Sequence, residues 1–105
     1  MKGRDPFYII GVDGGASKTR GVLFSDSGET LAITIEKGSN LSLNSESASD
    51  CILKIINNLC IDAKIPTDHV DAVGLGIAGS SNQNGRDMVF GKLDKIQLSQ
   101  RTIIM

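Results

Sequence analysis

The chain has 105 residues, of which 40% are apolar and 22% charged, and its formal net charge is −1. This size and balance are typical of one globular domain with a modest core. The near-neutral charge and the 4% aromatic content argue against a nucleic-acid partner, which needs basic and stacking surfaces. A membrane partner is not expected either, because no apolar run reaches the about 18 residues of a membrane-spanning helix.

The first third of the chain predicts three short strands joined by turns. The run 7–12 is apolar and rich in strand-forming residues, and a second such run covers 19–24. The segment 30–36 alternates between apolar and polar residues, which predicts a half-buried third strand. Because the turns between these runs are short, the three strands are expected to form an antiparallel meander. The apolar face of the third strand carries Leu31, Ile33 and Ile35.

The rest of the chain predicts two helices that alternate with two strands. Apolar residues recur at helical spacing from Ala48 to Ala63, which predicts a helix over 47–64. Ser47 and Asp50 resemble a loose capping box at its start. A second helix is expected over 84–96. Two further strands are expected, one before it over 71–78 and one after it over 101–105.

A meander followed by right-handed β-α-β crossovers places the five strands in the order 3-2-1-4-5. The predicted fold class is therefore α/β, a five-stranded mixed sheet with helices packed on it. Cys51 and Cys60 fall in the first predicted helix, about 13 Å apart along its axis, which is too far for a disulfide. We interpret them as reduced core thiols, which favours a cytoplasmic location.

A glycine turn separates the first two predicted strands, and its residue types suit phosphate binding. Glycine lacks a Cβ atom and accepts a positive φ, so neighbouring N–H groups can converge on one anion. We therefore expect Gly14 or Gly15 to have a positive φ, and the N–H groups of 14–18 to face one open cavity. Lys18 can supply a compact positive charge, and Asp13 a carboxylate for Mg²⁺. The alternative is an ordinary hairpin turn, because Asp-Gly is itself a strong hairpin signal.

Two other nucleotide-binding motifs do not fit their context. A Walker A loop has glycine before its lysine and a helix after it, whereas Ser17 precedes Lys18 and a strand is expected to follow. The run 74–79 matches the dinucleotide pattern G-x-G-x-x-G, but its first two glycines fall inside a predicted strand. We therefore do not expect nicotinamide or flavin binding.

On these residues the chain resembles the BadF/BadG/BcrA/BcrD ATPase family, and within it the N-acetylglucosamine kinase-like members. The segment 11–19 resembles the first phosphate motif of that family, 38–40 its sugar-side loop, and 74–79 the strand and glycine turn beside its substrate cleft. The resemblance implies a ribonuclease-H-like lobe of the actin-like ATPase fold, with residues 1–105 forming the N-terminal phosphate-binding lobe. It also implies ATP and Mg²⁺ as cofactors and an amino sugar as the acceptor.

The resemblance implies roles for individual residues. Asp13 would organise Mg²⁺, while Asn40 would hydrogen-bond a sugar hydroxyl, although a plain loop or cap role for Asn40 is an equal alternative. Gly79 and Ser80 would line the same cleft. The β- and γ-phosphates of ATP would be held by Gly14, Gly15, Ala16, Ser17 and Lys18.

The chain departs from the family pattern in two places. Ala16 and Ser17 stand where Gly and Thr are common, although Ser17 keeps the hydroxyl. In the family's kinases a catalytic aspartate follows the fifth strand, so the base is expected beyond Met105, together with the lobe that covers adenosine. We therefore expect this chain alone not to phosphorylate sugars. A homodimer of the full-length protein is left open.

Two alternative functions remain at this point. The chain could be an ATPase that activates a dehydratase, a class whose cysteines ligate an iron–sulfur cluster, or a non-catalytic nucleotide-binding module. The predicted burial of Cys51 and Cys60 disfavours the first alternative. The identity of the acceptor sugar is left open by the sequence.

Overall fold

The computed structural model describes residues 7–15, 17–40 and 42–105. Its elements follow the predicted order, and two short 3₁₀ turns are added, η1 (Thr67–His69) and η2 (Ser99–Arg101). The strands and helices are β1 (Tyr8–Gly14), β2 (Lys18–Ser25), β3 (Thr30–Lys37), α1 (Ser45–Ala63), β4 (Val70–Ile77), α2 (Gln83–Asp94) and β5 (Thr102–Ile104).

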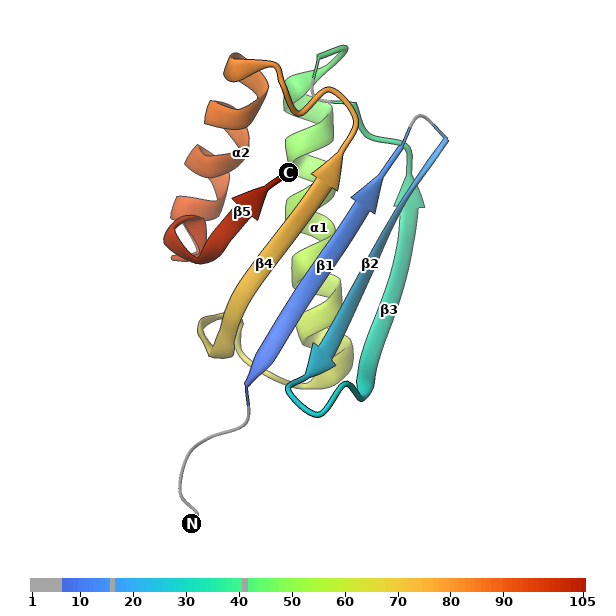
Figure 1. Cartoon of the computed structure of the whole chain (residues 1–105), viewed down its shortest axis with the longest axis vertical. Helices are drawn as coiled ribbons and strands as arrows, with labels where there is room; N and C mark the ends of the chain where they lie inside the picture. The colour runs from blue at the N-terminus through green and yellow to red at the C-terminus, as the bar shows by residue number, and fades with distance from the viewer. Residues whose placement is uncertain (1–6, 16, 41) are drawn as a thin grey trace.

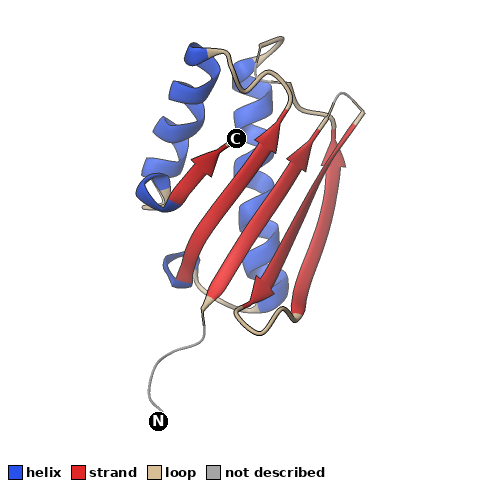
Figure 2. Cartoon of the chain, in the orientation of Figure 1, coloured by secondary structure: helices blue, strands red, loops and turns tan. Residues whose placement is uncertain are grey.

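The five strands form one mixed sheet in the order β3-β2-β1-β4-β5, which confirms the predicted topology (Figure 1). β1 pairs antiparallel with β2 and parallel with β4, so it lies at the centre of the sheet. Both helices lie on the same side of the strands (Figure 2). The sheet therefore has one face covered by helices and one face that the described residues leave open.

The core lies between α1 and the covered face of the sheet. Gly21 of β2 makes the closest approach, because a Cβ atom there would collide with Ile55 and come within 3.1 Å of Leu59. A glycine is thus required at this point to let the helix approach the strand. The buried apolar residues of α1 are Ala48, Cys51, Ile52, Ile55, Ile56, Leu59 and Cys60.

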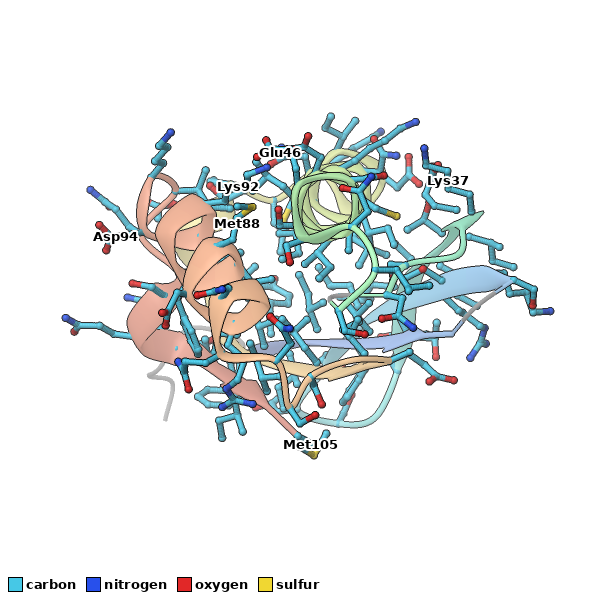
Figure 3. The ribbon with its side chains drawn as sticks, turned by 90° about the horizontal axis from the view of Figure 1, so that it is seen from above. Lys37, Glu46, Met88, Lys92, Asp94 and Met105 are labelled. Atoms are coloured by element: carbon cyan, nitrogen blue, oxygen red, sulfur yellow. The ribbon has the colours of Figure 1, made fainter. Side chains whose placement is uncertain are left out.

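The third strand turns its larger apolar residues away from this core. Ala32 is 9% exposed, whereas Ile33 and Ile35 are 47% and 56% exposed. Successive strand residues face opposite sides of a sheet, and both helices cover the side to which Ala32 points. Met105 also lies on the side of the sheet away from α1 (Figure 3). The alternation therefore identified the strand correctly, but its apolar face is not the one covered within this chain.

The first helix begins earlier than the capping-box prediction placed it. Asn44 is the N-cap residue, and its side-chain oxygen accepts a hydrogen bond from the backbone nitrogen of Ser47 at 3.0 Å. Asparagine is among the best N-cap residues, so the helix starts at Ser45 and the predicted Ser47–Asp50 box is wrong. At the other end Lys64 adopts the left-handed conformation, with φ of 60°, before Pro66 is reached. No helix in the described ranges has the length and apolar character needed to cross a membrane.

Lys92 of α2 joins the two helices through ion pairs with Glu46 and Asp50 of α1 (Figure 3). Its ammonium lies 2.7 Å from the Glu46 carboxylate. Burial lowers the pKa of Lys92, but hydrogen bonds and negative charge from Asp50 and Glu46 outweigh this effect, so the pKa is raised. The bridge is therefore formed by a charged lysine at neutral pH.

Candidate functional site

Three segments that are far apart in the sequence meet where β1 and β4 end. The backbone nitrogen of Ala78, after β4, donates to the carbonyl of Gly14 at 2.8 Å, and that of Ser39 donates to the carbonyl of Gly15 at 2.9 Å. Asn40 forms an isolated parallel bridge with Ala78. The structure thus brings the predicted phosphate turn, the 38–40 loop and the start of the β4–α2 loop into contact, and these loops meet at one end of the sheet (Figure 1).

The expected positive φ at Gly14 or Gly15 is wrong. Positive-φ glycines in the described part of the chain are Gly28 and Gly79. Gly14 continues the β1–β2 ladder opposite Thr19, and the nitrogen of Gly15 donates to the carbonyl of Lys18 at 3.0 Å. The N–H group of Gly15 is therefore used to close the hairpin and does not face a cavity.

Close packing accounts for Gly14. A Cβ atom at this position would lie 2.5 Å from the hydroxyl oxygen of Ser39 and 2.7 Å from Cδ1 of Ile77. Both distances are shorter than real Cβ contacts, so a side chain at this position would push the 38–40 loop or β4 away. Gly14 is thus needed for contact between the segments of the site, and not for an unusual backbone conformation.

The charged residues of the turn lie on the open side of the sheet. Asp13 is exposed and pairs in register with Arg20, and alternation places Lys18 on the same side as Arg20. Asp13 and Arg20 line a shallow groove of about 460 Å³ together with Gly76 and Met105. A carboxylate and two cations therefore stand together in reach of solvent. Ser17 is exposed beside them, and the predicted contribution of Ala16 lies outside the described residues.

Arg20 is a candidate site residue that was not assigned from the sequence. It is an exposed strand charge, and the ladder places it directly opposite Asp13. The signal was present in the hairpin pattern, since a short turn fixes which residues of two strands face each other. A guanidinium at this position can bind phosphate oxygens in a bidentate manner.

The residues predicted to contact the sugar lie together, but the side chains of two of them already make hydrogen bonds within the protein. The side-chain oxygen of Asn40 accepts from the nitrogen and the hydroxyl of Ser42, at 2.9 and 2.7 Å. The hydroxyl of Ser80 donates to the carbonyl of Met105 at 2.8 Å. Gly79 has a φ of 79°, so it supplies the turn that follows β4. The loop role of Asn40 is thus observed directly, and its amide nitrogen can donate a hydrogen bond.

Two further hollows lie on the covered side. A pocket of about 200 Å³ lies beside the start of α1 and is lined by Asn40, Ser47 and their neighbours. A second one, of about 390 Å³, lies between β3 and α1 and is lined by Glu36, Asp50 and Cys51 among others. Only the smaller of these two pockets includes a predicted site residue, Asn40.

The cysteines have the environment of structural thiols. Cys51 and Cys60 are both buried, and burial is the main cause that raises the pKa of each. Thiolates are therefore disfavoured, and this argues against cluster ligation within this chain. No three His, Cys, Asp or Glu side chains within 7–15, 17–40 and 42–105 come close enough to hold a metal ion. Asp13 is an exposed carboxylate near the end of β1, and a single carboxylate can hold Mg²⁺ when phosphate oxygens and water complete the coordination.

Comparison with known proteins identifies the group to which this architecture belongs. Residues 10–100 match the sequence model of the BadF/BadG/BcrA/BcrD ATPase family. The chain belongs to this family. The resemblance carried by the glycine turn and by 74–79 is therefore confirmed, and nucleotide use is the property that the family name states.

Solved structures that resemble this chain confirm the actin-like ATPase fold. A proposed N-acetylglucosamine kinase from Chromobacterium violaceum matches with a TM-score of 0.64 and 27% identity, over 82% of this chain and 31% of that one. Gluconate kinase from Lactobacillus acidophilus matches with a TM-score of 0.56 and 24% identity, over 70% of this chain and 16% of that one.

A third structure, YeaZ from Pseudomonas aeruginosa, matches with a TM-score of 0.59 and 16% identity, over 94% of this chain and 43% of that one. The chain thus spans less than half of the length of each of these three structures. A search of curated protein sequences returns no match.

Proposed function

We propose that this chain is the phosphate-binding lobe of an ATP-dependent amino-sugar kinase, in which the complete enzyme transfers the γ-phosphate of ATP to a hexose hydroxyl. The single observation that carries this proposal is the convergence of the β1–β2 turn, the 38–40 loop and the β4–α2 loop at one end of the sheet. Phosphoryl transfer needs a phosphate site and an acceptor site side by side, and the similarity to the Chromobacterium violaceum protein supports a sugar as the acceptor.

The residues near the β1–β2 turn have different roles in binding the phosphates. Lys18 and Arg20 place positive charge beside the turn, where they bind the β- and γ-phosphate oxygens. Asp13 would hold Mg²⁺ through its carboxylate, and the bound ion would supply positive charge to neutralise the phosphates. The hydroxyl of Ser17 donates to a phosphate oxygen. The N–H group of Gly15 is hydrogen-bonded within the hairpin. Side chains therefore make more of the phosphate contacts than the glycine pattern predicted.

On the acceptor side, Asn40 donates from its amide nitrogen to a sugar hydroxyl, with Gly79 and Ser80 forming the neighbouring wall. The chain spans 31% of the related Chromobacterium violaceum structure, and we place the base that accepts the hydroxyl proton and the adenosine-covering lobe outside this span. The lobe described here therefore binds and orients the phosphates, and full turnover is a property of the complete enzyme.

Lys18→Met is expected to weaken the binding of Mg²⁺-ATP by about 10- to 100-fold, because hydrogen bonds to charged groups contribute roughly 1.5–3 kcal/mol. The measurement is displacement of a fluorescent ATP analogue from the chain. Lys95→Met is the matched control, because Lys95 is exposed at the end of α2 and outside the site. Equal affinities for Lys18→Met and the unmodified chain would refute the assignment of the turn as the phosphate site.

A further inference from the structure

Two buried hydroxyl groups lie between the phosphate turn and the 38–40 loop. Thr19 is fully buried, Ser39 is 4% exposed, and their hydroxyl oxygens are 2.8 Å apart. Burying a hydroxyl is costly unless it is hydrogen-bonded. Neither residue is part of the phosphate or sugar contacts proposed above, so this pair needs a separate explanation.

The direction of the hydrogen bonds follows from counting donors. The hydroxyl of Thr19 donates to the carbonyl of Lys37 at 2.9 Å. A hydroxyl has one hydrogen, so Thr19 has none left, and Ser39 must be the donor between the two. The result is an ordered series of hydrogen bonds that runs from Ser39 through Thr19 to the Lys37 carbonyl. The Sγ atom of Cys51 also lies 3.7 Å from this carbonyl.

This series of hydrogen bonds joins the residues next to Lys18, in the proposed phosphate site, and Asn40, in the proposed acceptor site. Thr19 directly follows Lys18, and Ser39 directly precedes Asn40. The backbone nitrogen of Ser39 adds a third link, to the carbonyl of Gly15 at 2.9 Å. The absence of a Cβ atom at Gly14 is what admits the Ser39 hydroxyl so closely. The loop therefore cannot move relative to the turn without breaking buried hydrogen bonds.

We propose that Thr19 and Ser39 are positioning residues that transmit nucleotide occupancy of the turn to the acceptor loop. A shift of Lys18 on binding phosphate moves Thr19, which moves Ser39 and with it Asn40. Binding of nucleotide and binding of acceptor are thereby coupled within this lobe. Coupling of two binding sites requires a structural element whose conformation is changed by ligand binding at either site. The hydrogen-bonded hydroxyls of Thr19 and Ser39 are that element. This inference rests on the proposed phosphate site.

The test is an NMR titration of the ¹⁵N-labelled chain with Mg²⁺-ADP. In the unmodified chain, the amide signals of Gly38, Asn40 and Ser42 are expected to shift with the same midpoint as those of Gly15 and Lys18. Thr19→Val keeps the shape of the side chain but removes its hydroxyl. In this variant the signals of the turn still shift, whereas the shifts in the loop are strongly reduced, and what remains of them passes through the backbone bond from Ser39 to Gly15.

Two further variants separate positioning from simple loss of stability. Thr19→Ser keeps the hydroxyl and is expected to restore the loop shifts, which a merely structural defect would not do. Ser39→Ala removes the donor while leaving the Thr19–Lys37 bond intact, and it replaces Thr19→Val if that variant does not fold. Loop shifts that persist at full size in Thr19→Val or Ser39→Ala overturn the inference. If the unmodified chain shows no shifts at the turn, the proposed phosphate site fails, and the inference fails with it.

Discussion

Gly21→Ala is expected to lower the free energy of unfolding by about 1–3 kcal/mol, the usual cost of forcing an extra group into a packed core. The added Cβ atom would collide with Ile55 and crowd Leu59, so α1 must move away from β2 or adopt strained rotamers. A domain of this size has a total stability of only about 5–15 kcal/mol. The measurement is urea unfolding followed by circular dichroism.

Gly11→Ala is the matched control for this experiment. Gly11 lies in the neighbouring strand on the open side of the sheet, and a Cβ atom there would have nothing within 4 Å. We expect this variant to be as stable as the unmodified chain or more stable, because alanine reduces the freedom of the unfolded chain. Equal destabilisation by both substitutions would show that α1 does not pack on β2 as described.

Ile55→Ala is expected to cost about 2–5 kcal/mol, because it removes buried methyl groups and leaves a cavity. Ile55 is fully buried in the centre of α1, whereas Ile61 in the same helix is 71% exposed. Ile61→Ala should therefore change the free energy of unfolding by less than about 0.5 kcal/mol. The same urea titration serves for both variants.

The two core substitutions should also interact. Truncation of Ile55 makes room for the Cβ atom of alanine at position 21, so Gly21→Ala should cost less in the Ile55→Ala background than in the unmodified chain. Neighbouring residues commonly show coupling energies of about 0.5–3 kcal/mol in such cycles. Additive effects would contradict the contact between these two residues.

The fold was predictable because it rests on short-range periodicity. The alternation of 30–36 and the helical spacing from Ala48 to Ala63 identified their elements, and the resulting strand order is the one observed. Boundaries were less accurate where a local side chain decides them. Asn44 caps α1, so the helix starts at Ser45, two residues before the predicted start at 47. This boundary depends on one side-chain hydrogen bond, which the hydrophobic periodicity does not reveal.

The candidate site was only partly predictable, because its internal contacts join residues that are distant in the sequence. The residue types of the turn indicated Asp13 and Lys18, and their exposure is compatible with that assignment. The predicted reason for a glycine at position 14, a positive φ, was wrong. Glycine is needed there because atoms of Ser39 and Ile77 leave no room for a Cβ atom. For the same reason no sequence pattern pointed to the hydroxyl pair of Thr19 and Ser39.

The central claim is that the β1–β2 turn of this lobe binds the phosphates of a nucleotide. The most direct test is to titrate the ¹⁵N-labelled, unmodified chain with Mg²⁺-ATP and to map the amide shifts onto the structure. The account predicts that the largest shifts occur at Gly14, Gly15, Lys18 and Arg20. Shifts that instead cluster around the hollow between β3 and α1, or no shifts at saturating nucleotide, would contradict it.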